Sequence, residues 1–157
     1  MEKQYKVLLI EDEKAAQIFF SQIVKERKLK YDCIIVESVS EAKLFLASEQ
    51  FDIVIVNNLS KDKNCLDIFE VKLDIPMIAI AATGDERFAV NAMRAGAYDY
   101  LIKDSEKNYL ELLPLAIENA IQRRRNEKEN KFLSNILMEI GDSVYITDAQ
   151  DRIVFVN

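Results

Sequence analysis

Several short apolar runs are followed by residues that could bind a metal ion or a phosphate. These ends lie at residues 11–13 (Glu-Asp-Glu), 57–58 (Asn-Asn), 81–83 (Ala-Ala-Thr) and 103–104 (Lys-Asp). Glu11 and Asp12 offer carboxylate ligands of the kind that Mg²⁺ accepts together with waters and phosphate oxygens. Lys103 would neutralise a phosphate or a carboxylate at the same place. The plainer alternative is that these acids and lysines are solvated loop residues.

The apolar runs themselves predict buried β-strands. They are short, mostly rich in β-branched residues, and lie at residues 6–13, 33–38, 53–56, 76–82 and 97–103. Such runs are typical of parallel strands that are buried on both faces. The segments between them have helical spacing, with a capping box at Ser38–Glu41 and a helix end at Gly96. We therefore expect an α/β fold, a doubly wound five-stranded parallel sheet, whose strands end at one common edge.

Composition narrows the chemistry available to this chain. The 157 residues contain no histidine, which excludes histidine triads and histidine–metal sites. The net charge of −6 argues against a nucleic-acid partner for this chain. Cys33 and Cys65 lack metal-ligand spacing and suit a reducing compartment. Because no apolar run approaches the length of a membrane span and no signal peptide is evident, we expect a cytoplasmic protein without a membrane partner.

The character of the chain changes in its last third. Residues 122–131 are polar and compatible with a solvated helix, and apolar spacing returns in residues 132–140. Residues 141–157 read as strand, turn and strand, with the turn at residues 148–151. We therefore predict three parts, residues 1–122, 123–140 and 141–157, of which the middle one is a linker helix.

The segments LLIEDE, FDIVIVNN, PMIAIAATGD and AMRAGAYDYLIKD, with the spacing between them, carry a family resemblance. Over residues 6 to about 122 the chain resembles the receiver domain of two-component response regulators. The resemblance implies a flavodoxin-like sheet with strand order 2-1-3-4-5 and a partner histidine kinase. It also implies that Glu11 and Asp12 hold Mg²⁺ and that Lys103 contacts a phosphoryl group. Tyr100 matches the aromatic residue that turns inward when such a domain switches.

Three positions depart from the family pattern. Asn57 stands where the family has the phosphoaccepting aspartate, Ala81 where it has Thr or Ser, and Cys65 where it usually has glycine. An amide is a very poor nucleophile compared with a carboxylate. We therefore expect a degenerate pseudo-receiver, an interaction and dimerisation unit without enzymatic activity, in which Mg²⁺ binds weakly and no cofactor is held tightly. Because Ala81 leaves space beside Tyr100, we also expect its ring to point inward.

Two alternatives to this interpretation stay open. The first is a phosphoaccepting receiver that carries an Asp→Asn substitution at position 57; the simultaneous departure at Ala81 argues against it. The second is a flavodoxin-like binder of a small molecule or nucleotide. The chain has only three glycines, so no glycine-rich phosphate loop can be drawn, and no histidine base is present.

The end of the chain supports two expectations about partners. The segment DSVYITDAQDRIVFVN resembles the opening of a PAS sensory domain, which implies downstream PAS and output domains in the full-length protein. We also expect a homodimer formed by the last helix and its extension. The expected apolar seam consists of Leu110, Leu113, Ile117, Ala120 and Ile121, and then Leu133, Ile136, Leu137 and Ile140.

Overall fold

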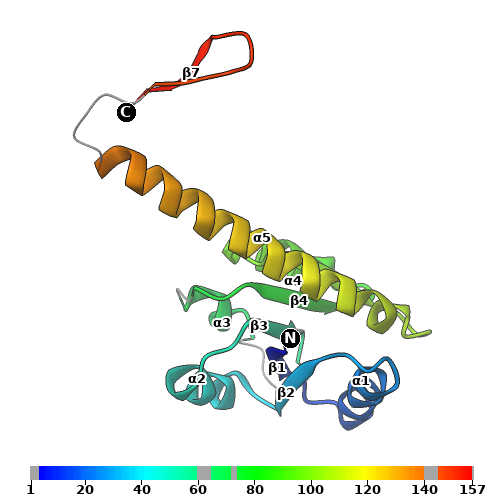
Figure 1. Ribbon diagram of the computed structural model, residues 1–157. Helices are drawn as coiled ribbons and strands as arrows, with labels where there is room; N and C mark the ends of the chain where they lie inside the picture. The colour runs from blue at the N-terminus through cyan, green and yellow to red at the C-terminus, as the bar shows by residue number, and fades with distance from the viewer. Residues whose placement is uncertain (1–3, 60–64, 72–73, 140–144, 157) are drawn as a thin grey trace. The chain divides into compact units, whose positions relative to one another are not determined.

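A computed structural model describes residues 4–59, 65–71, 74–139 and 145–156 of the chain (Figure 1). By its contacts the chain divides into two compact units, Met1–Ile121 and Gln122–Asn157. Each unit is described by itself below. The predicted division into residues 1–122, 123–140 and 141–157 stays a prediction.

The first unit is built around a parallel sheet of five strands. The strands are β1 (Tyr5–Ile10), β2 (Tyr31–Val36), β3 (Ile53–Asn57), β4 (Met77–Ala82) and β5 (Asp99–Lys103), in the order β2-β1-β3-β4-β5. All four strand pairings are parallel. Every residue of β3 is buried, as expected of a central strand covered on both faces. The predicted fold, sheet and strand order are confirmed.

Helices cover both faces of this sheet. They are α1 (Lys14–Glu26), α2 (Val39–Ser48), α3 (Asp67–Glu70), α4 (Glu86–Ala95) and α5 (Asn108–Glu139). One apolar cluster joins the sheet to α2, α3 and α4, and a second joins it to α1 and the first part of α5. This two-sided covering explains why the strands read as continuous apolar runs in the sequence.

Local sequence signals set several helix ends. The hydroxyl of Ser38 accepts a hydrogen bond of 3.2 Å from the backbone N–H of Glu41 at the start of α2. Gly96 ends α4 with a φ of 110°, a left-handed conformation that favours glycine. Helical spacing did not show which apolar residues face the sheet: Ala15, Ile18 and Met93 are exposed. Apolar residues on these helices outnumber the inward positions, so spacing alone could not choose among them.

The predicted first half of the dimer seam is wrong. Leu110, Leu113, Ile117, Ala120 and Ile121 are at most 4 % exposed, because they pack in the cluster shared by α1, α5 and the sheet. The final helix of a doubly wound sheet must cover its share of one face, and these residues do so. They are not available to a second chain, and Ile140, at the other end of the seam, lies outside the described residues.

The second unit contains the rest of α5 and a hairpin. Strands β6 (Tyr145–Thr147) and β7 (Ile153–Val156) pair antiparallel, which confirms the predicted strand–turn–strand. In the turn, a carboxylate oxygen of Asp148 accepts hydrogen bonds from the backbone N–H groups of Gln150 and Arg152. Across the part of the chain that the structure describes, no helix is long and apolar enough to cross a membrane.

Candidate functional site at the carboxyl edge of the sheet

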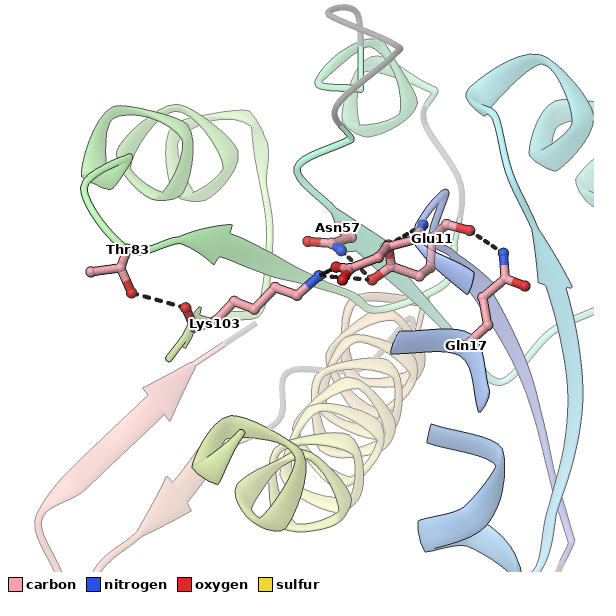
Figure 2. A network of polar contacts seen from close by, with 6 residues as sticks. Glu11, Gln17, Asn57, Thr83 and Lys103 are labelled. Carbon is pink, nitrogen blue, oxygen red and sulfur yellow. Dashed lines mark hydrogen bonds and ion pairs between the residues drawn. The ribbon is translucent and has the colours of Figure 1, made fainter. Parts of the chain in front are cut away.

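Three of the predicted site residues meet where β1, β3 and β5 end (Figure 2). The side-chain amide of Asn57 donates a hydrogen bond from Nδ2 to Oε2 of Glu11. The Nζ atom of Lys103 lies 3.5 Å from the same oxygen of Glu11. The sheet therefore brings an acid, an amide and a lysine together at one edge, as the sequence predicted.

Glu11 is the centre of this group, and its carboxylate is deeply buried. The residue is 3 % exposed, as is Asn57. The other carboxylate oxygen of Glu11, Oε1, accepts a hydrogen bond of 2.9 Å from the backbone N–H of Glu13, at the start of α1. A buried carboxylate is tolerated only when it is hydrogen-bonded and compensated by positive charge. Both Glu11 oxygens thus have donors that belong to the protein itself.

Lys103 is shared between two acids. Its Nζ lies 2.6 Å from Oε2 of Glu13 in addition to its contact with Glu11. Burial lowers the pKa of Lys103, but the hydrogen bond to Glu13 and the charge of Glu11 outweigh it, so the pKa is raised above the ordinary 10.5. The lysine is therefore fully charged at neutral pH. The backbone carbonyl of Lys103 accepts a hydrogen bond of 2.9 Å from the hydroxyl of Thr83.

The sequence interpretation missed the role of Glu13. This residue is the third acid of the run at residues 11–13. It supplies a backbone donor to Glu11 and a carboxylate to Lys103, which lies 90 positions away. The acidic run was visible in the sequence, but only the packing of β1 beside β3 and β4 beside β5 shows which acid Lys103 contacts. Asp12, the other acid of the run, is half-buried.

Asn58 and Cys65 form a separate group of contacts. The side-chain amide of Asn58 donates a hydrogen bond from Nδ2 to the carboxylate of Asp85. The side-chain oxygen Oδ1 of Asn58 lies 3.6 Å from Sγ of Cys65. Asp85 in turn caps α4 by accepting from the backbone N–H of Phe88 at 3.3 Å. Successive residues of a strand point to opposite faces, which explains why Asn57 and Asn58 contact different partners. Asn58 links the end of β3 to the start of α4 and is no substitute for Asn57.

Ala81 and Tyr100 do not join the site. Ala81 is fully buried in the apolar cluster on the α4 face of the sheet. Tyr100 is 45 % exposed, so the expectation of an inward ring is wrong. Its ring lines a surface hollow of about 350 Å³ together with Val90 and Met93 of α4. Ile102, which neighbours Ala81 across the β4–β5 pairing, packs against the same cluster.

The residues of this site do not fit a tightly held Mg²⁺ ion. Mg²⁺ needs carboxylate oxygens that are open to it, but both oxygens of Glu11 already accept hydrogen bonds and Asn57 contributes a neutral amide. Within residues 4–59, 65–71, 74–139 and 145–156, no group of three or more His, Cys, Asp or Glu side chains is arranged to hold a metal ion.

Calorimetry should therefore show no saturable Mg²⁺ binding to the native chain at millimolar concentration. An Asn57→Asp variant should bind the ion measurably more tightly, because it replaces a neutral donor with a third carboxylate. Tight Mg²⁺ binding by the native chain would show that the Asn57–Glu11 contact opens readily.

Comparisons with known proteins relate this chain to one family. Residues 7–113 match the family model described as "Response regulator receiver domain". The chain is 31 % identical over 116 residues to "DNA-binding transcriptional regulator NtrC" of Proteus hauseri, which covers 71 % of this chain and 24 % of that protein. It is 29 % identical over 115 residues to "Alginate biosynthesis transcriptional regulatory protein AlgB" of Pseudomonas aeruginosa, a match that covers 71 % of this chain and 25 % of that protein.

A solved structure shows the same fold. The signal receiver domain of an HD domain-containing protein from Pseudomonas fluorescens Pf-5 superposes with a TM-score of 0.68 at 23 % identity, covering 82 % of this chain and 95 % of that one. The chain spans about a quarter of the length of the two curated relatives. On the match over residues 7–113, this chain belongs to the response regulator receiver domain family.

Proposed function

We propose that this receiver domain works without phosphorylation, as a protein-interaction and dimerisation module of a multidomain signalling protein. The observation that carries the proposal is the contact between Asn57 and Glu11. At the position where the family accepts a phosphoryl group, this chain has an amide that donates a hydrogen bond to a buried acid. The site is satisfied by its own side chains and holds no carboxylate nucleophile at position 57.

Three components needed for phosphoryl transfer are missing or engaged. The amide of Asn57 cannot form an acyl phosphate at a useful rate. Ala81 supplies a methyl group where the family's hydroxyl would contact the phosphoryl oxygens. The charge of Lys103 is compensated by Glu11 and Glu13. An incoming phosphate would have to displace Glu13 from the lysine before it could gain the same attraction.

The relatives support a proposal for the partners of the full-length protein. One relative is named as a DNA-binding regulator, which supports an output domain that contacts nucleic acid beyond this acidic domain. The PAS-like hairpin of residues 145–156 supports a sensory domain directly after the helix. A histidine kinase or another signalling protein would then dock on the receiver without transferring phosphate.

Incubation of the native chain with acetyl phosphate and Mg²⁺ tests the proposal. The intact mass should stay unchanged, while a phosphoaccepting receiver treated in parallel gains a phosphoryl group. A phosphoryl adduct mapped to the loop after β3 would overturn the proposal.

A second candidate is a working phosphoreceiver that carries an Asp→Asn substitution at position 57. The presence of Glu11, Asp12 and Lys103 favours it, because these residues match the family's metal and phosphoryl contacts. Replacing Asn57 by Asp discriminates the two candidates.

A further inference from the structure

We propose that the folded chain slowly joins Lys103 to Asn57 through a side-chain amide bond, with the release of ammonia. The bond connects β5 to β3 across the intervening strand β4, at the carboxyl edge of the sheet. It consumes both the amide at the phosphoacceptor position and the charge of the lysine, so it closes the site permanently. This inference concerns a covalent reaction between the site's own side chains and goes beyond the proposed function.

One oxygen of Glu11 contacts both groups that react. Oε2 accepts a hydrogen bond from Nδ2 of Asn57, and Nζ of Lys103 lies 3.5 Å from the same oxygen. Figure 2 shows the side chains of Lys103 and Asn57 directed toward this carboxylate from two different strands. The amine nitrogen and the amide nitrogen are therefore neighbours around a single atom. The carbon to be attacked, Cγ of Asn57, is one covalent bond away from this contact.

The surroundings of the site favour attack by the lysine over attack by water. Glu11 and Asn57 are both 3 % exposed, so bulk water has little access to the amide carbon. The side chain of Lys103 is 24 % exposed, which leaves ammonia a way out. An amide is a poor electrophile, but well-oriented reactions within one molecule reach effective concentrations of about 10⁵–10⁸ M.

The two acids supply the proton transfers. Lysine must lose a proton before its amine can attack, and Oε2 of Glu13, 2.6 Å from Nζ, is placed to accept it. The lone pair of Nζ then forms a bond to Cγ of Asn57. Glu11 takes a second proton from Nζ and passes it to Nδ2, because its Oε2 contacts both nitrogens. The bond between Cγ and Nδ2 breaks, and ammonia leaves.

The step balances without an oxidant or a reductant. Of the three protons on the lysine ammonium, one stays in the new amide and one leaves with Nδ2. The third passes through Glu13 to the released ammonia, which becomes ammonium in water. Because Lys103 is charged at neutral pH, few chains are able to react at any moment, and the bond therefore forms slowly.

Intact-mass spectrometry of the native chain, sampled over several weeks of storage, tests the proposal. A species lighter by one ammonia, about 17 Da, should accumulate. A cyclic imide of asparagine loses the same mass, so tryptic digestion must follow. The digest of the lighter species should contain a branched peptide in which Lys103 carries the segment with Asn57, because trypsin does not cleave after an acylated lysine.

Three results would overturn the bond. They are an unchanged mass, a lighter species without the branched peptide, and a gain of about 1 Da, which shows that water has hydrolysed the amide in place of the lysine. A phosphoryl group adds mass, whereas this reaction removes it. Failure of the bond is therefore distinguishable from failure of the phosphorylation-independent function.

Two variants test the roles of the side chains. Lys103→Arg keeps a positive charge near Glu11 but has no amine, so it should give no branched peptide. Glu11→Gln keeps the size of the side chain but cannot carry the proton, so it should form the bond at least about tenfold more slowly than the native chain. A native rate in Glu11→Gln would overturn the proton route.

The matched control replaces a lysine outside the site. Lys14 pairs with Glu37 at the surface, where the two side chains are 71 % and 49 % exposed. Lys14→Arg should therefore accumulate the lighter species and the branched peptide at the native rate. A slowing in Lys14→Arg equal to that in Lys103→Arg would show that the reaction does not belong to this site.

Discussion

An Asn57→Asp variant should accept a phosphoryl group from acetyl phosphate, whereas the native chain should not. The substitution restores a carboxylate nucleophile next to Lys103. It also removes the amide hydrogen bond to Glu11 and places two carboxylates side by side at a buried position. Like charges at this distance repel strongly, so a cation must come between them. Phosphorylation of the variant should therefore depend strictly on Mg²⁺.

The gain should be partial, because Ala81 still lacks the hydroxyl. We expect Asn57→Asp/Ala81→Thr to be phosphorylated further and to hold its phosphate longer than Asn57→Asp. Intact-mass spectrometry over time gives both quantities. Ala81→Thr alone is the control and should gain no mass. Because Ala81 is fully buried, the added atoms of threonine could overpack the core, which typically costs about 1–3 kcal/mol. The fold of each variant that carries Ala81→Thr is therefore checked by circular dichroism.

The outcome also decides between the two candidates for the site. Complete phosphorylation and switching from Asn57→Asp alone would favour a working receiver with one substituted residue. No phosphorylation of either variant would show that the site has lost more than the acceptor and the hydroxyl.

A Lys103→Met variant should lose about 2 kcal/mol of the free energy of unfolding. Removing one partner of a fully buried ion pair typically costs about 3–5 kcal/mol, because the other charge stays buried. Here the Glu11 side chain is 4 % exposed and Lys103 is 24 % exposed, so solvent reduces the cost. Urea denaturation of both proteins gives the difference.

The matched control breaks an exposed ion pair. Lys14 pairs with Glu37, and their side chains are 71 % and 49 % exposed. Lys14→Met should change stability by no more than about 0.5 kcal/mol. Adding Glu11→Gln to Lys103→Met should recover part of the loss, because the uncompensated charge is then gone. Equal losses from Lys103→Met and Lys14→Met would show that Lys103 does not stabilise Glu11.

The Lys103 contribution should also depend on pH in a defined direction. Its pKa is raised in the folded protein above 10.5, so the folded state binds the proton more tightly than the unfolded chain. The stability difference between the native chain and Lys103→Met should therefore stay constant from neutral pH to about pH 10. It should fall as the pH rises through the folded pKa. A difference that vanishes already at pH 8 would contradict this assignment.

The sequence by itself determined the fold and three residues of the site. Strands buried on both faces must be continuously apolar, and runs such as Ile53–Asn57 therefore stand out without a structure. Parallel strands end at a common edge, so the residues that follow them were expected to meet, and Glu11, Asn57 and Lys103 do meet. The replacement of the acceptor by Asn57 is likewise a fact of the sequence.

Only the tertiary structure decided which side chains contact each other and which faces are already covered. Lys103 turned out to share its charge between Glu11 and Glu13. Tyr100 is exposed, whereas Ala81 and Ile102 pack in the cluster on the α4 face. On α5, Leu113 is buried and Leu112 exposed, although both are leucines. Local spacing records only that a residue is apolar; the sheet, which takes one side of α5, decides what remains exposed to a partner.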